Sequence, residues 1–307
     1  MRRALELSLL AALGVAACAT GAVDPRVVVP VDAGAPRDVA SQQDAGATDA
    51  GSVDDVPAAP DDTGPAPDAG LRCVPNHDGV IQRSEIAFLV GATVLYSVND
   101  PGVNVSPVDT EGVVVDGTRR WDYSAARTAD HRVLDEVIAP TGQWWSSLYA
   151  SATYAAVIDR ASDTLGVFRA SATELSLLGT VSREANRTNL AMNPPVTVLR
   201  FPLQVGDTWT QQVTGLGTYN YTPLSNVSTY TTHVDAVGEV WTPAGRFPAL
   251  RVRTDLDQSV PLTLLRVTRR TVTFVSECWG VVAKLTSVDN ESAAAFTTAA
   301  EYRRLGL

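Results

Sequence analysis

Apolar and polar residues alternate along most of the chain after residue 72. In residues 250–257, Leu, Val, Thr and Leu alternate with Arg, Arg, Asp and Asp, and residues 197–203 and 281–286 follow the same period of two. This alternation is typical of antiparallel strands that have one face on a core and one face in water. Residues 73–307 are therefore expected to form a mostly β domain, built as one large curved antiparallel sheet or as a two-sheet body.

Breaks in the alternation mark where strands are expected to end. In residues 265–275 the apolar positions change from odd to even numbers near Arg269–Arg270, which predicts a bulge or a broken strand. Short helices are expected at about 84–88 and 125–131. Clusters of Gly, Pro, Asn and Asp predict turns at residues 99–102, 116–117, 215–217, 243–245 and 289–290.

The N-terminus has the pattern of an export signal. A positive start is followed by an apolar stretch that is too short to span a bilayer, which predicts a signal peptide at residues 1–17. The stretch ends Val-Ala-Ala before Cys18, which resembles the lipobox of bacterial lipoproteins and implies diacylation of Cys18 after cleavage. No Asp follows that would favour retention at the inner membrane, so the expected location is the outer membrane, facing the periplasm or the cell surface. The alternative is ordinary cleavage and release.

Residues 18–72 differ in composition from the rest of the chain. They hold no aromatic residue, ten Asp, and the triplet Asp-Ala-Gly at irregular intervals. Such a stretch has too little apolar area to fold, and its charges repel one another. We expect a disordered tether that holds the β domain away from the lipid.

Charge and motif content narrow the function classes. The formal net charge is −10, and an acidic chain lacks the basic face that nucleic-acid phosphates require, so no nucleic-acid partner is expected. No nucleophile elbow, zinc-protease motif, phosphate loop or Cys-x-x-Cys is present, and we expect a protein that is not an enzyme. His233 falls on the polar positions of an alternating stretch, which predicts that its side chain faces solvent. The aromatic-rich stretches at 144–149 and 219–230 are expected mainly in the core, although an exposed row of them would suit sugars or lipid.

The cysteine count predicts one disulfide. If Cys18 carries lipid, Cys73 and Cys278 are the remaining thiols of the chain. A cell-envelope compartment is oxidising, so these two are expected to pair and to tie the start of the domain to its last strands. The alternative is two free buried thiols.

One loop at the start of the domain resembles the calcium loop of EF-hand and dockerin proteins. In that resemblance Asn76, Asp78 and Glu85 supply side-chain oxygens and Val80 supplies its carbonyl. The first position is Val74 where the family has Asp, which removes a charge from the site. The alternative is a plain turn followed by a capped short helix. No other cofactor is expected.

Three motifs in the C-terminal half form an ordered set: Phe201-Pro-Leu-Gln-Val-Gly-Asp-Thr-Trp209, Val240-Trp-Thr-Pro-Ala-Gly-Arg-Phe247 and Glu277-Cys-Trp-Gly-Val-Val282. This order resembles TapB-like and related domains of unknown function in bacterial secreted proteins. The resemblance covers residues 198–288 and implies a curved antiparallel sheet of the kind seen in lipoprotein carriers such as LolA. It carries no active-site residue over to this chain.

These features favour a lipid-anchored cell-envelope lipoprotein whose β domain has a binding or structural role without catalysis. Its contact with the membrane would be the N-terminal lipid. The LolA resemblance implies an alternative, a carrier of a lipid or other apolar ligand in an open cleft. A hydrolase with an unrecognised carboxylate or Ser site is the third class. An apolar cleft would favour the carrier, and interlocked aromatic rings at the centre would count against it.

Overall fold

The computed structural model describes residues 73–86, 88–159, 163–260 and 265–306. The signal peptide predicted at 1–17, the lipidation site Cys18 and the tether to residue 72 lie outside the described residues. The described part of the chain is built from strands, with one 3-10 helix. Its elements are β1 (Val80–Ile81), η1 (Arg83–Glu85), β2 (Thr93–Asn99), β3 (Val113–Val115), β4 (Thr118–Asp122), β5 (Asp130–Glu136), β6 (Tyr154–Asp159), β7 (Thr164–Ala170), β8 (Glu174–Ser182), β9 (Asn189–Arg200), β10 (Leu203–Gln204), β11 (Thr208–Tyr219), β12 (Thr222–Thr242), β13 (Gly245–Val260), β14 (Leu265–Ser276), β15 (Gly280–Ser287) and β16 (Ala299–Leu305).

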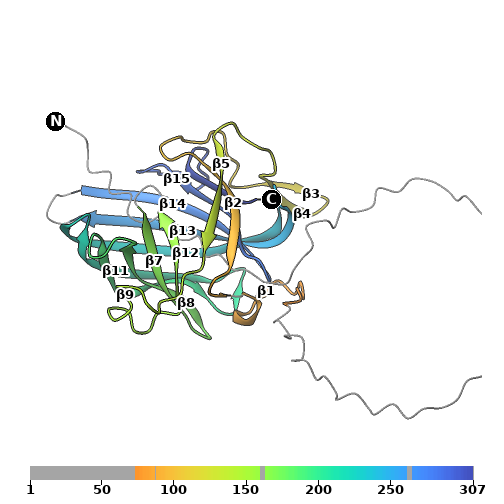
Figure 1. The fold of residues 1–307 in the computed structure, drawn as a ribbon. Helices are drawn as coiled ribbons and strands as arrows, with labels where there is room; N and C mark the ends of the chain where they lie inside the picture. The colour runs from red at the N-terminus through yellow and green to blue at the C-terminus, as the bar shows by residue number, and fades with distance from the viewer. Residues whose placement is uncertain (1–72, 87, 160–162, 261–264, 307) are drawn as a thin grey trace, which may run out of the picture. The chain divides into compact units, whose positions relative to one another are not determined.

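Twelve of these strands form a nearly closed, barrel-like antiparallel sheet (Figure 1). Their order is β5-β2-β16-β15-β14-β13-β12-β11-β9-β8-β7-β6. The first and last strands of this order meet where Ile138, after β5, and Ala155 in β6 exchange two backbone hydrogen bonds. β3 and β4 extend the sheet beside β12, and β1 pairs with β10. The prediction of a large curved antiparallel sheet is confirmed.

We call the end of the barrel at the Ile138–Ala155 bridge the closed end. Because neighbouring strands are antiparallel, the turns that join β7 to β8, β12 to β13 and β14 to β15 lie at this same end. The turns that join β11 to β12 and β8 to β9 lie at the opposite end.

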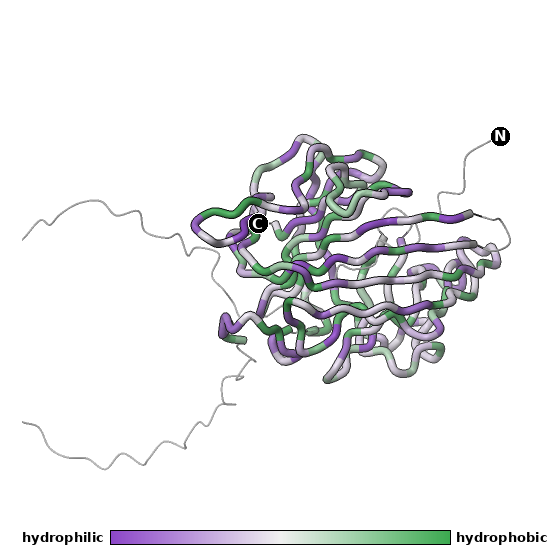
Figure 2. The backbone as a smooth tube through the Cα atoms, turned by 180° about the vertical axis from the view of Figure 1, so that it is seen from behind, coloured by the Kyte–Doolittle hydropathy of each residue, from purple (hydrophilic) through white to green (hydrophobic). Residues whose placement is uncertain are grey.

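Side chains alternate between the inside and the outside of the barrel, as the sequence pattern predicts. In β13, Val252, Thr254 and Leu256 are buried on the inner face, while Arg253 and Asp255 lie on the outer face and are partly exposed. Figure 2 shows hydrophilic and hydrophobic positions alternating along the long strands. The larger apolar cluster includes the inner faces of the strands.

A smaller apolar cluster lies on the outer face of β6, β7 and β8, under residues 138–152. Trp145 and Tyr149 of the aromatic-rich stretch are buried in it. Tyr230 of the second stretch is buried on the inner face, whereas Tyr221 at the β11–β12 turn is 61% exposed. The aromatic side chains are thus mainly core residues, as expected.

The bulge or break predicted near Arg269–Arg270 is wrong in its position, because β14 runs through both residues and its pairing with β15 shifts register later, between Phe274 and Val275. Arg269 lies opposite Leu256 on the inner face. Phe274 lies on the outer face and packs against Trp121, with ring centroids 4.8 Å apart. The apolar parity changes along β14 because a different face of the strand is covered at each end.

Four of the five predicted turns are present, and the fifth, at Gly215–Gly217, is wrong. β11 continues through these glycines and stays paired with β12. A Cβ atom on Gly215 would lie 2.3 Å from Oδ1 of Asn226. Glycine is needed here because a neighbouring side chain lies directly on the strand backbone.

Neither predicted helix forms as expected. The first is reduced to the single 3-10 turn η1, and the second, at 125–131, is wrong because β5 begins at Asp130. The guanidinium of Arg304 donates hydrogen bonds to the carbonyls of Tyr123 and Ala125, at 3.1 and 2.7 Å. A carbonyl that an α-helix would use is therefore bound to a side chain from β16.

Candidate functional site in the barrel interior

Residues 73–86 and 88–92, which we call the plug, cross the closed end of the barrel. Cys73 is bonded to Cys278 at the β14–β15 turn, and β1 pairs with β10. The N–H of Gly91 then donates to the carbonyl of Val137, just after β5. These attachment points belong to strands that are far apart in the barrel order, so the plug spans the end of the barrel.

Aromatic rings fill the inside of the closed end. Phe88 of the plug stacks on Tyr154 of β6 with centroids 5.2 Å apart, and Tyr154 stacks on Phe168 of β7 at 5.1 Å. Ile81 and Ile86 of the plug are buried in the same cluster. Burial raises the pKa of Tyr154 far above its ordinary value, so its hydroxyl stays neutral.

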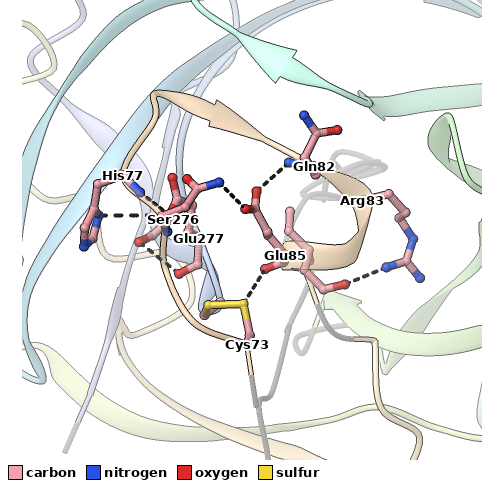
Figure 3. Close-up of a disulfide and its surroundings, with 10 residues drawn as sticks. Cys73, His77, Gln82, Arg83, Glu85, Ser276 and Glu277 are labelled. Carbon is pink, nitrogen blue, oxygen red and sulfur yellow. Dashed lines mark hydrogen bonds and ion pairs between the residues drawn. A yellow bond between two sulfur atoms is a disulfide. The ribbon is translucent and has the colours of Figure 1, made fainter. Parts of the chain in front are cut away.

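The predicted disulfide between Cys73 and Cys278 is present and fastens the plug to one turn of the barrel (Figure 3). The N–H of Cys278 also donates to the carbonyl of Glu85, at 2.7 Å. The carboxylate of Glu277 accepts hydrogen bonds from two consecutive N–H groups of the plug, at 2.8 and 3.0 Å. The start of the domain is thus tied to its last strands both covalently and by hydrogen bonds.

The structure brings together three of the side chains predicted to bind calcium. Nδ2 of Asn76 donates to Asp78 at 3.1 Å and to Glu85 at 2.9 Å, and the N–H of Val80 donates to Asp78 at 2.8 Å. The amide of Asn76 therefore stands between the two carboxylates. In the described part of the chain, no group of three acidic, His or Cys side chains has a geometry that would hold a metal. A plain turn accounts for these contacts, and the calcium site stays a prediction.

Four charged side chains, which we call the buried quartet, meet inside the barrel: Asp135, Lys284, Glu301 and Arg303. Nζ of Lys284 lies 2.8 Å from Glu301, and Nε of Arg303 lies 2.9 Å from the other oxygen of the same carboxylate. Arg303 also pairs with Asp135. Two positive and two negative charges therefore compensate one another. Lys284, the only lysine of the chain, is 1% exposed.

The pKa directions in the quartet follow from burial and pairing. Burial lowers the pKa of Lys284. Burial acts to raise the pKa of Glu301, but the charges of Lys284 and Arg303 outweigh it and the pKa is lowered. Burial acts to lower the pKa of Arg303, but Glu301 and Asp135 outweigh it and the pKa is raised. Glu301 and Arg303 are thus held in their ionised forms.

A second set of polar side chains lies on the inner face of β11, β12 and β13, and we call it the inner wall. Tyr230 lies opposite Gln211 across the β11–β12 pair. Nε2 of Gln258 donates to Ser228 at 3.3 Å, and Oδ1 of Asn226 accepts the N–H of Gly215 at 3.1 Å. The inner wall consists of Gln211, Asn226, Ser228, Tyr230 and Gln258.

Three polar groups of the inner wall have no hydrogen-bond partner within the described residues: Nε2 of Gln211, Nδ2 of Asn226 and the hydroxyl of Tyr230. Asn226 and Tyr230 are 1% and 6% exposed. Burial raises the pKa of Tyr230; Ser228 is close enough to act against this, but the two hydroxyls form no hydrogen bond of normal geometry. A buried polar group without a partner costs roughly 1–3 kcal/mol. The inner wall therefore presents groups that a bound molecule would satisfy.

The sequence reasoning missed the inner wall. Its β12 residues, Asn226, Ser228 and Tyr230, share the parity of Val234, which is the parity that faces the core. A run of polar residues at core positions is the signal that would have found them. His233 lies on the outer face, where its ring hydrogen-bonds with Thr208, as its parity predicts.

No protein-family model, curated protein or solved structure matches this chain. The resemblance of residues 198–288 to TapB-like domains, and through them to LolA, therefore stays a prediction. Among the described residues, no helix is long enough and apolar enough to cross a membrane.

Proposed function

We propose that residues 73–307 form a non-catalytic binding domain, held at the cell envelope as part of a lipoprotein. The observation that carries this proposal is the inner wall, in which Asn226 and Tyr230 are buried and each leaves a polar atom unpartnered. Single unpartnered atoms occur elsewhere among the described residues, such as the hydroxyl of Tyr154, but in the inner wall three of them lie along two neighbouring strands. They suit a site that receives a ligand.

The charged groups of the interior support binding rather than catalysis. Lys284, Glu301 and Arg303 form ion pairs with one another, whereas a general acid or base must be free to exchange a proton with the substrate. The side chains of the inner wall are amides and hydroxyls, which keep their protonation state near neutral pH. A hydrolase is therefore the class that we favour least.

The aromatic stack at the closed end counts against a carrier of lipid. Phe88, Tyr154 and Phe168 interlock there, so this part of the interior is packed with rings. An acyl chain laid on the inner wall would leave its polar groups unsatisfied. We keep the carrier as the alternative, because residues on the inner faces of β6 to β9, such as Ile158 and Leu177, are apolar and buried.

The proposed envelope location rests on Cys18 and on the disulfide. Disulfides persist in oxidising compartments such as the periplasm, and the link between Cys73 and Cys278 begins where the tether would end. A lipid on Cys18 would supply the contact with the outer membrane.

The anchor is tested by replacing Cys18 with Ala. The parent should partition into the detergent phase with the outer membrane, and the variant should be soluble in the periplasm or the medium. Cys73→Ser is the matched control, because it removes a different thiol and should remain in the detergent phase. Equal partitioning of the parent and the Cys18→Ala variant would contradict the anchor.

The binding role is tested by native mass spectrometry of the chain purified from the cells that produce it. We expect a mass above the covalent mass that disappears on denaturation. A clean covalent mass, combined with no binding of any probe described in the next subsection, would contradict a binding domain and leave a structural role.

A further inference from the structure

Resting on this proposed function, we infer that the inner wall binds a neutral small molecule rich in hydroxyl or amide groups, such as a sugar. The three unpartnered groups belong to two neighbouring strands of one wall. Gln211 of β11 faces Tyr230 of β12, and Asn226 lies four residues before Tyr230 in β12, on the same face. At about 3.3 Å per residue, these groups cover roughly 13 Å of the wall.

The orientation of Asn226 determines what a ligand has to offer it. Its Oδ1 accepts the N–H of Gly215 at 3.1 Å, so the amide cannot turn over without losing this hydrogen bond. Its Nδ2 is therefore a donor held in place on the inner wall, and it has no partner among the described residues. Nε2 of Gln211 is a second donor, and the hydroxyl of Tyr230 both donates and accepts. The ligand needs several acceptors along its length, with at least one donor.

The charge of the surroundings excludes an ionic ligand. None of the five inner-wall residues carries a charge, and burial raises the pKa of Tyr230, which keeps it neutral. Arg269 is the buried cation opposite Leu256 on the inner face, and it is already paired with Asp289. A charged ligand would be desolvated here without a counter-charge.

The apolar neighbours of the inner wall complete the match to a sugar. Val213 of β11 lies opposite Ser228, and Leu256 of β13 lies opposite Tyr230. Both are buried on the inner face. A sugar ring offers hydroxyl groups at its rim and C–H groups on its faces, so it can satisfy the donors and still pack on these side chains and on the ring of Tyr230.

The test uses the full chain with Cys18→Ala, which removes any lipid and so allows calorimetry without detergent. The probes are maltose and N-acetylglucosamine as neutral sugars, glucuronate as a charged sugar, and dodecanoate as an acyl chain. We expect a neutral sugar to bind and glucuronate and dodecanoate to bind more weakly or not at all.

Two Tyr→Phe variants separate recognition from stability. Tyr230→Phe deletes a hydroxyl that has no partner, so it should weaken binding of the neutral sugar roughly three- to tenfold while leaving the thermal midpoint unchanged or higher. Tyr149→Phe is the matched control: its hydroxyl donates to Asn189 at 2.8 Å in the outer cluster, so it should lower the thermal midpoint and leave binding unchanged.

The outcomes distinguish this inference from the proposed function. Stronger binding of dodecanoate or glucuronate, or unchanged sugar binding by Tyr230→Phe, would overturn the ligand class and leave a binding domain. No binding of either neutral sugar also overturns the ligand class. If no probe binds and the native mass is clean, the binding domain fails as well and the inner wall holds buried water alone.

Discussion

The closed end and the inner wall belong to one barrel but differ in the contacts that hold them together. Near the closed end, Lys284, Glu301 and Arg303 are paired with one another, and the plug is fastened by a disulfide and by backbone hydrogen bonds. In the inner wall, Asn226 and Tyr230 are equally buried but leave polar atoms unpartnered. Burial alone therefore does not distinguish the paired charges of the quartet from the unpartnered groups of the inner wall. An unpartnered atom alone does not mark a ligand site either, since the buried hydroxyl of Tyr154 at the closed end also has no partner within the described part of the chain; the inner wall differs in that three such atoms lie along one wall.

Removing the disulfide at the closed end should lower the stability of the domain more than any other change proposed below. The double variant Cys73→Ser, Cys278→Ser opens a link across 205 residues, and the chain-entropy model assigns about 5 kcal/mol to a loop of that length. We expect a large drop in the urea midpoint followed by Trp fluorescence, with binding by the folded fraction retained. An unchanged midpoint would mean that the noncovalent contacts of the plug are sufficient.

The buried quartet gives the next largest effect. Arg303→Met removes the guanidinium that pairs with both Asp135 and Glu301 inside the barrel, which should cost roughly 3–5 kcal/mol of unfolding free energy. Arg266→Met is the matched control, because its pair with Asp257 is exposed and should contribute less than about 1 kcal/mol. Equal losses in urea titrations of the two variants would contradict a structural role for the quartet.

Gly215→Ala tests the inner wall itself. The new methyl group would meet Oδ1 of Asn226, so we expect a loss of roughly 1–3 kcal/mol in stability and weaker ligand binding as the amide is displaced. Thr214→Ala, one residue earlier on the exposed outer face, should change neither quantity. Calorimetry and thermal unfolding of both variants measure this difference, and normal binding by Gly215→Ala would argue against Asn226 as a ligand contact.

Acid should produce the smallest effect, and it should act on stability without changing ligand affinity. The pKa of Glu301 in the folded chain lies below its ordinary value of 4.5, so its stabilising contribution is complete above that value and is lost as the pH falls through the lower folded pKa. The urea midpoint should therefore fall in the acid window below 4.5, and the carboxylates of Glu174 and Asp257, whose pKa values are also lowered, should contribute to the fall. The inner wall has no group that titrates in this window, so the ligand affinity of the folded chain should stay flat. Affinity that falls in parallel with stability would contradict the separation of the two regions.

Local patterns were enough to predict the strands and the disulfide. The period of two in residues 250–257 indicates which face of the strand is exposed to solvent. This can be read from the sequence without knowing the partner strands. Cys73 and Cys278 were paired by counting thiols, and the structure confirms the bond. The helix predicted at 125–131 does not form, and the carbonyl of its first residue, Ala125, accepts a hydrogen bond from Arg304, which is nearly 180 residues away in the chain.

Barrel closure and the inner wall depend on contacts between distant residues, and the sequence does not display them. The bridge of Ile138 to Ala155 joins the two ends of the strand order. Gly215 was assigned to a turn because glycine is common in turns. Glycine is less often found inside a strand, where it leaves room for a neighbouring side chain to lie against the backbone. The contact between the amide of Asn226 and the backbone of Gly215 is what identifies Asn226 as part of the inner wall.

The burial of Lys284 has a consequence for covalent chemistry on the protein. It is the only lysine, its amine is paired with Glu301, and 1% of its side chain is exposed. A reagent that acylates amines acts on the free, unprotonated and accessible group, so the folded domain offers it no lysine target. The extent of reaction at Lys284 then measures the fraction of molecules that have unfolded.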